Sequence, residues 1–177
     1  MSLVLPIVFA FLTSVAPSQI KVFDGKVVEH GLKDVDVVLF VDYGKPITER
    51  RFFVYDLRAK RVLYSDYVGH ARKSGVNVPH TFSNTVGSHM SALGRYRIGE
   101  SYRSKTFGTS VRLHGLEKGN SRALKRAIVA HDVQGGIVVT NSRFDDLYSK
   151  GCFTFFRENY DRILSFMTPG RILIAYQ

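Results

Sequence analysis

The chain has 177 residues, of which 45% are apolar and 23% are charged. This length allows one domain, and this balance excludes the disordered, collagen-like and disulfide-scaffold classes of protein. The 25 Lys and Arg residues outnumber the 15 Asp and Glu residues and give a formal charge of +10. Such a charge favours a polyanionic partner: nucleic acid, anionic lipid or an acidic cell-wall polymer. The one cysteine, Cys152, excludes an internal disulfide and a zinc site made of several thiolates.

The amino terminus is typical of a secretion signal. Residues 3–12 form an uncharged apolar run, small residues follow, and the first charged side chain is Lys21. The run is too short to span a bilayer, because spanning takes about 20 apolar residues. We therefore expect residues 1–18 to direct export to the periplasm and residues 19–177 to form the domain, with no stable membrane insertion after cleavage. A buried amino-terminal helix or strand is the alternative interpretation.

The rest of the chain predicts a β-rich domain of the α+β class. A short amphipathic helix is expected over residues 20–34, and apolar spacing predicts a second helix over Phe156–Met167. Short β-branched and apolar runs predict strands over residues 35–41, 51–55, 61–68, 93–99, 109–113, 126–131 and 171–176. Residues 69–87 form a long segment rich in Gly, Ser and Asn, and loops of this length are usually functional or mobile.

Cys152 and His131 are the candidate catalytic pair. A thiol with a pKa of about 8.5 is a poor nucleophile until it loses its proton, which a nearby imidazole can accept. His131 ends a predicted strand, and Gly151 allows a tight turn that points amides at a developing oxyanion. We expect a helix starting just after Cys152, and the charge of Lys150, to favour the thiolate. Alone, the cysteine is more simply a core thiol and the histidine a capped strand end; their combination indicates acyl transfer.

Several other polar residues are candidates for substrate contact. The spacings of His70, His89 and His114 fit no compact zinc motif. We expect His70, His89 and Ser91 to line a cleft, although local loop hydrogen bonds explain the last two equally well. Arg112 lies on a predicted strand, where it either grips carboxylates of the substrate or belongs to a solvated basic face.

His131, a spacer of residues 132–148 and then Ser149-Lys150-Gly151-Cys152 resemble the signature of the L,D-transpeptidases of bacterial cell walls. The similarity continues upstream in the order expected for the murein L,D-transpeptidase catalytic-domain group. The segments that carry it are residues 41–46, 53–57, 68–75, 82–94, 112–117 and 126–131.

This resemblance implies a β-sandwich-like catalytic fold with the cysteine at the mouth of a cleft. It implies that Cys152 attacks the carbonyl of the L-configured centre of a diamino acid in a peptidoglycan tetrapeptide stem. D-Ala then leaves and a thioester remains. It assigns His131 as the base, with its ring oriented by a backbone carbonyl or a neighbouring side chain. It assigns the amides of Gly151 and Cys152 to the oxyanion hole, and we expect Ser149 and Lys150 to contact the substrate. No metal or organic cofactor is expected, and the acceptor stays open: water, a second stem, a D-amino acid or a lipoprotein lysine.

Several positions depart from the family pattern, among them Lys150, where His or an aromatic residue is commoner, and His114, where Asp is common. Asp132 stands where Gly usually follows the histidine, and on a strand it would point to the face opposite His131, or else crowd the cleft. After the cysteine the family often has a hydrophobic residue and then Arg or Asn, or Pro-Ala, where this chain has Phe153-Thr154. This difference predicts altered recognition of the substrate carboxylate. A catalytically degenerate peptidoglycan-binding relative is therefore the first alternative. A basic nucleic-acid-binding protein is the second, and the export signal and the lack of a nucleic-acid motif count against it. The sequence does not indicate the oligomeric state.

Overall fold

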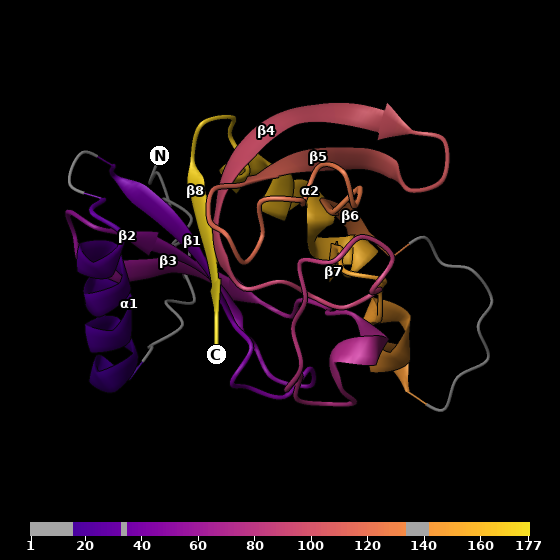
Figure 1. Cartoon of the computed structure of the whole chain (residues 1–177). Coiled ribbons are helices and arrows are strands. Elements are labelled where there is room, and N and C mark those ends of the chain that lie inside the picture. The colour runs from indigo at the N-terminus through magenta and orange to yellow at the C-terminus, as the bar shows by residue number, and fades with distance from the viewer. Residues whose placement is uncertain (1–15, 33–34, 134–141) are drawn as a thin grey trace, which may run out of the picture.

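The computed structural model of the chain describes residues 16–32, 35–133 and 142–177. Within these residues, eight strands form one sheet in the order β3-β2-β1-β8-β4-β5-β6-β7 (Figure 1). The strands are β1 (Val37–Asp42), β2 (Phe52–Asp56), β3 (Arg61–Asp66), β4 (Gly94–Ser104), β5 (Gly108–Gly115), β6 (Val129–Asp132), β7 (Phe153–Phe155) and β8 (Ile172–Tyr176). The helices are α1 (Pro17–Glu29) and α2 (Arg157–Phe166), with short 3-10 helices η1 (Arg72–Ser74) and η2 (Arg143–Leu147). The predicted β-rich α+β class is confirmed.

Strands β1, β2 and β8 are buried on both faces, because α1 covers one face and the main core covers the other (Figure 1). Phe23 of α1 is fully buried and stacks on Phe40 of β1, with 4.4 Å between ring centroids. Its ring also contacts Phe53 and Tyr55 of β2. Alternate residues of the same strands, such as Leu39 and Val54, point to the main core. This two-sided burial explains why these strands are nearly continuous apolar runs in the sequence.

The two halves of the sheet face each other across the main core. Strand β4 pairs with β8 near its start and with β5 along most of its length, and its pairing with β5 shifts register between Ile98 and Ser101. Figure 1 shows the β4–β5 ribbon curving over the rest of the domain. The core joins residues of both halves, such as Val54 and Phe155, with Tyr160 of α2. The sheet is therefore continuous in its hydrogen bonding and sandwich-like in its packing.

The boundaries differ from the predicted ones where apolar pattern and backbone geometry disagree. The strand expected over residues 126–131 begins only at Val129, because residues 118–127 form turns and Ala127 has a φ of 52°. Strand β4 continues beyond the predicted Gly99 to Ser104, because it pairs with β5 beyond the apolar core. The described part of the chain contains no helix that is long and apolar enough to cross a membrane.

The predicted export signal falls largely outside the described residues. Residues 1–15 are not described, and residues 16–18 lie at the start of α1. Export and the domain boundary at residue 19 stay predictions.

Gly69 joins three segments that meet beneath the candidate site. Its N–H donates to the Thr154 carbonyl at 2.8 Å, and its own carbonyl accepts from the Tyr43 hydroxyl. The Thr154 hydroxyl in turn donates to the Leu147 carbonyl. A Cβ at residue 69 would collide with both the Leu147 carbonyl oxygen and the Thr154 hydroxyl. Only glycine allows this close approach between the loop before η1, the end of η2 and β7.

We expect Gly69→Ala to lower the free energy of unfolding by about 3 kcal/mol, because the collision involves a backbone atom that cannot rotate away. Gly25→Ala is the matched control. Gly25 is exposed in α1 and has open space around it, so alanine there should raise the free energy of unfolding by about 0.5–1 kcal/mol. Urea unfolding of the three proteins measures both effects. Equal stability of Gly69→Ala and wild type would contradict the close packing.

Candidate active site

A cavity of about 780 Å³ opens between β6, β7, η2 and the tip of the β4–β5 hairpin. Its volume is within the range of small-molecule binding sites. Cys152 and His131 both line it, together with Ser149, Lys150 and His89. Five of the residues that the sequence singles out therefore meet at one cavity, although they are spread over three separate stretches of the chain.

The pairing of β6 with β7 brings the thiol and the imidazole to the same face of the sheet. The two strands are parallel, with Ala130 opposite Phe153 and His131 opposite Thr154. Cys152 directly precedes β7 and stands two residues before Thr154, so it lies diagonally across from His131. Ala130 and Phe153 point the other way into the core. Cys152 is half-buried and His131 is 5% exposed.

The His131 ring is held in one tautomer. Its Nδ1 atom lies 2.7 Å from the backbone carbonyl oxygen of Asp132. A carbonyl only accepts, so Nδ1 carries the proton and Nε2 carries the lone pair. Burial lowers the pKa of His131, which keeps the imidazole neutral at neutral pH. The ring is thereby arranged to accept a proton at Nε2, and a backbone carbonyl orients it.

Asp132 does not belong to the cavity. Its carboxylate is buried on the opposite face of β6, where it accepts a hydrogen bond from Arg157 of α2 at 3.2 Å. The possibility that Asp132 crowds the cleft is therefore wrong, because the alternation of the strand sends it towards α2. Of the two residues after the cysteine, Phe153 is part of the core and Thr154 lines the cavity.

The loop before Cys152 is braced by Ser149. The Ser149 hydroxyl donates to the Cys152 carbonyl at 2.7 Å and accepts from the Gly151 N–H at 3.1 Å. Gly151 has a φ of 125°, a conformation that L side chains rarely adopt, and its backbone packs closely against the Met90 carbonyl. The tight turn predicted at Gly151 is present. The Gly151 amide, expected at the oxyanion hole, is instead engaged with Ser149 in this structure.

The thiol of Cys152 is in a mixed electrostatic environment. Its Sγ donates to the Ala127 carbonyl at 3.6 Å. Burial raises the pKa of Cys152, while the Val129 N–H and the Arg126 guanidinium act in the opposite direction. The thiol is therefore protonated at rest and needs a base to become a nucleophile.

The helix predicted over Phe156–Met167 is present as α2, but the strand β7 separates its amino end from Cys152. The basic side chain that acts on the Cys152 pKa is Arg126, not Lys150. Arg126 donates to the Ser83 carbonyl at 2.6 Å and to the Met90 carbonyl, which fixes its guanidinium at the cavity wall. Reasoning from the sequence placed Arg126 in a strand and missed its role, because the turn that brings it to Cys152 is a tertiary feature.

Three residues predicted to contact substrate lie away from the cavity. Arg112 forms an ion pair with Glu100 at 2.6 Å and covers the ring of Tyr102. Ser91 is buried, and its hydroxyl accepts from the Ala71 N–H. His70 is fully buried beneath the Ser149 loop, where its backbone carbonyl accepts from the Ser149 N–H at 2.9 Å. Ser91 and His70 therefore support the loops of the site without lining it.

The His70 side chain is part of a buried network around Arg51. Its Nδ1 accepts from the Arg51 guanidinium at 2.7 Å, and its Nε2 donates to the Gly75 carbonyl at 2.9 Å. Arg51 also donates twice to the Val68 carbonyl. Burial first, and then the Arg51 charge, lower the pKa of His70 to about 4. The network fixes the backbone on both sides of Gly69. It thereby also fixes His70, whose carbonyl binds the Ser149 N–H.

His70 should make folding stability depend on pH. In the unfolded chain the pKa is about 6.5, so the unfolded state binds a proton before the folded state does. The stabilisation is fully present above pH 6.5 and is lost as the pH falls towards 4, by up to about 3 kcal/mol. His70→Gln keeps one donor and one acceptor but does not titrate, and we expect it to lose this part of the slope. Urea unfolding between pH 4 and 8 measures it, with the exposed His80→Gln as the control that keeps the slope.

The pH dependence of Cys152 alkylation by iodoacetamide should show how the charge of Arg126 affects the thiol pKa. Because the chain has one cysteine, intact mass counts the reaction directly. We expect the alkylation rate to rise with pH, with a midpoint above the ordinary thiol pKa. Arg126→Gln should move this midpoint to still higher pH, because a cation that favours the thiolate is removed. Arg126→Lys keeps the charge and should stay close to wild type. An unchanged midpoint in Arg126→Gln would show that the guanidinium acts only through its loop contacts.

Known proteins resemble this chain in sequence and in fold. A family model described as the L,D-transpeptidase catalytic domain matches residues 15–176. A comparison with curated proteins finds no match. Among solved structures, the chain is similar to the helical cell shape determining protein Pgp2 (K307A mutant) from Campylobacter jejuni, with a TM-score of 0.55 and 12% identity over 92% of this chain and 57% of that one. It is also similar to Bd1075 from Bdellovibrio bacteriovorus, with a TM-score of 0.51 and 13% identity over 80% of this chain and 48% of that one.

The chain thus spans about half the length of these two structures, and at this identity they show a shared fold alone. The family model covers nearly the whole chain, including the cavity and both candidate catalytic residues. The chain belongs to the L,D-transpeptidase catalytic-domain family.

Proposed function

We propose that the protein is a cysteine-dependent L,D-transpeptidase or L,D-carboxypeptidase that acts on the bond between the diamino acid and D-Ala of peptidoglycan stem peptides. The reaction passes through a thioester on Cys152, with His131 as the base. The observation that carries this proposal is the shared cavity of Cys152 and His131, in which the hydrogen bond of Nδ1 to the Asp132 carbonyl leaves the ring lone pair on Nε2.

The charges around the cavity support an anionic peptide as substrate. Arg72, Lys73, Arg126 and Lys150 contribute basic side chains to the lining, and Asp145 and Asp146 contribute acidic ones. Stem peptides carry carboxylates on several residues and an amine on the diamino acid. Basic side chains attract the carboxylates, and the acidic pair at η2 suits the amine. This mixed lining fits a stem peptide better than nucleic acid, whose backbone presents phosphates alone.

The first half-reaction begins with proton transfer from Cys152 Sγ to His131 Nε2. The sulfur attacks the carbonyl carbon, and the negative charge on its oxygen is stabilised by backbone amides of the Cys152 loop. The Cys152 amide is the candidate donor, because the Gly151 amide already donates to Ser149. His131 then returns the proton to the departing amine, so D-Ala leaves as the C–N bond breaks and the thioester remains.

The second half-reaction reverses these roles. An acceptor amine or water gives a proton to His131 and attacks the thioester carbonyl, and the C–S bond breaks as the thiol is restored. An amine completes transpeptidation, and water completes hydrolysis. Neutral His131 is needed in both halves, so its lowered pKa keeps the site active at mildly acidic pH.

Digestion of purified tetrapeptide muropeptides tests this function. We expect the wild-type protein to release D-Ala, with new dimers if the acceptor is a second stem and tripeptides if it is water. Cys152→Ala should abolish release, and His131→Gln should slow it by roughly 100-fold or more, because general-base catalysis is lost. Mass spectrometry of the protein during turnover should detect the acylated cysteine.

Arg112→Gln is the matched control, because Arg112 lies outside the cavity, and it should retain turnover. Well-folded wild-type protein that binds the muropeptides and leaves every tetrapeptide intact would support the non-catalytic wall-binding alternative. Release of D-Ala that persists in Cys152→Ala would remove the cysteine from the mechanism.

A further inference from the structure

The tip of the β4–β5 hairpin brings an aromatic side chain onto the candidate base. Phe107 stacks on the His131 ring, with 4.0 Å between ring centroids and 21° between ring planes. Both residues line the same cavity. Phe107 is far from His131 in the sequence, and nothing in the apolar pattern distinguishes it from a residue of the core.

The backbone of the hairpin turn fixes where Phe107 lies. The Ser104 hydroxyl accepts from the N–H groups of Thr106 and Phe107, both at 3.2 Å. Gly108 then takes a left-handed conformation with a φ of 65° and pairs with Ser104 across the ribbon. A side-chain cap and a left-handed glycine are the two devices that hold a short hairpin turn in one shape. Phe107 is therefore held over His131 by the turn.

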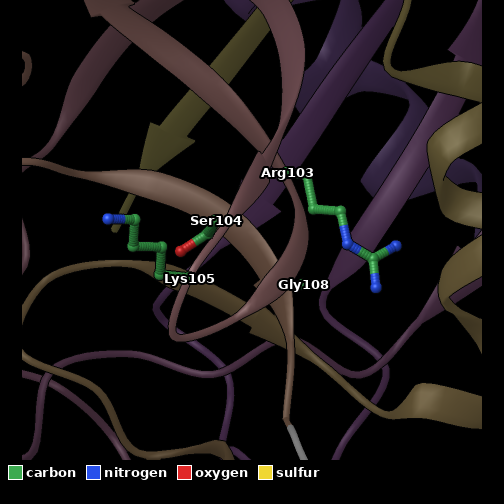
Figure 2. Close-up of a pocket in the computed structure, with 4 residues that line it drawn as sticks. All are labelled: Arg103, Ser104, Lys105 and Gly108. Atoms are coloured by element: carbon green, nitrogen blue, oxygen red, sulfur yellow. The ribbon is translucent and has the colours of Figure 1, made fainter.

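The rest of the turn is open to solvent and gathers no polar site of its own. An open pocket there is lined by Arg103, Ser104, Lys105 and Gly108. Figure 2 shows Arg103 and Lys105 extending to opposite sides of the ribbon, so their charges do not converge on one ligand. The feature of this hairpin that reaches the site is the aromatic ring.

We propose that Phe107 is a positioning residue for His131, which holds the imidazole plane and shields one ring face from water so that Nε2 keeps one orientation in the cavity that it shares with Cys152. This inference rests on the proposed function. No bond forms or breaks at Phe107: the proton passes from Cys152 Sγ to His131 Nε2 and back. The Nδ1 hydrogen bond to the Asp132 carbonyl fixes one edge of the ring, and the stack fixes its face. Together they fix the geometry that efficient proton transfer requires.

The electrostatic surroundings of His131 allow the effect of Phe107 to be measured separately. Burial lowers the pKa of His131, and the Asp132 charge acts in the opposite direction. Cys152 faces His131 from the loop before β7. The other charged groups that line the cavity are Arg72, Lys73, Arg126, Asp145, Asp146 and Lys150. None of them changes when Phe107 is replaced, so a change in the His131 pKa in such a variant reports the loss of the covering ring.

The test is an NMR titration of His131 in wild type, Phe107→Ala, Phe107→Leu and Phe107→Tyr, combined with the pH profile of Cys152 acylation. We expect Phe107→Ala to raise the His131 pKa towards that of an exposed imidazole and to move the acidic limb of acylation upward. The plateau acylation rate should fall by roughly tenfold with little change in KM, because a misaligned base slows the chemical step. Phe107→Tyr keeps the flat ring and should stay near wild type. Phe107→Leu keeps apolar cover without a flat ring and should lower the rate while shifting the pKa less than alanine does.

Lys105→Ala is the control for the hairpin, because this exposed side chain lies in the same turn and outside the cavity of Cys152. An unchanged His131 pKa in folded Phe107→Ala, with only KM altered, would overturn the proposal and make Phe107 a substrate contact. The titration does not depend on turnover. If wild type lacks activity yet Phe107→Ala still shifts the His131 pKa, the proposed function fails while the positioning of His131 stands.

Discussion

The parallel pairing of β6 with β7 is the constraint on which the site depends. Its register sets Cys152 diagonally across from His131 and turns both side chains to one face of the sheet. The neighbouring positions Ala130 and Phe153 enter the core, which locks the register, because a slip of one residue would bury the imidazole and expose the phenyl ring. The same alternation sends Asp132 to α2, where Arg157 neutralises it. A short strand of three residues, β7, thus decides which polar groups reach the cavity.

The loop that carries the thiol is held from below by buried polar groups. Arg51 is buried, and desolvation lowers its pKa to about 10, yet its hydrogen bonds to backbone carbonyls and to His70 compensate for burial. The His70 carbonyl accepts a hydrogen bond from Ser149, and the Ser91 hydroxyl accepts one from the loop before η1. A buried charge with several fixed partners is costly to disturb, so the network favours one loop conformation over many. Buried polar residues outside the cavity therefore help to define where Cys152 lies.

The thiol and the imidazole are both neutral at rest, and this state is a consequence of their burial. Burial raises the pKa of Cys152 and lowers that of His131, which disfavours a standing ion pair between them. Arg126 lessens the cost of forming the thiolate, and Phe107 covers the imidazole from the hairpin side. The proposed chemistry then starts by proton transfer within the cavity when substrate is present, and not from a thiolate exposed to oxidants and unrelated electrophiles.

The β-rich class, most of the strands and the helix α2 could be predicted from the sequence, which also singled out Cys152, His131 and Gly151 as candidates for the site. These follow from short-range signals: alternating or continuous apolar runs, helical spacing, a glycine before a lone cysteine, and a recognisable family signature. The sequence did not predict that Arg126 and Phe107 reach the cavity, or that His70, Ser91 and Arg112 do not line it. For Asp132, strand alternation predicted one of two possible positions, and the structure has that one, facing α2. The physical reason is that these outcomes depend on strand register, on a left-handed turn at Ala127 and on the curvature of the β4–β5 ribbon, which arise from contacts between residues distant in the chain.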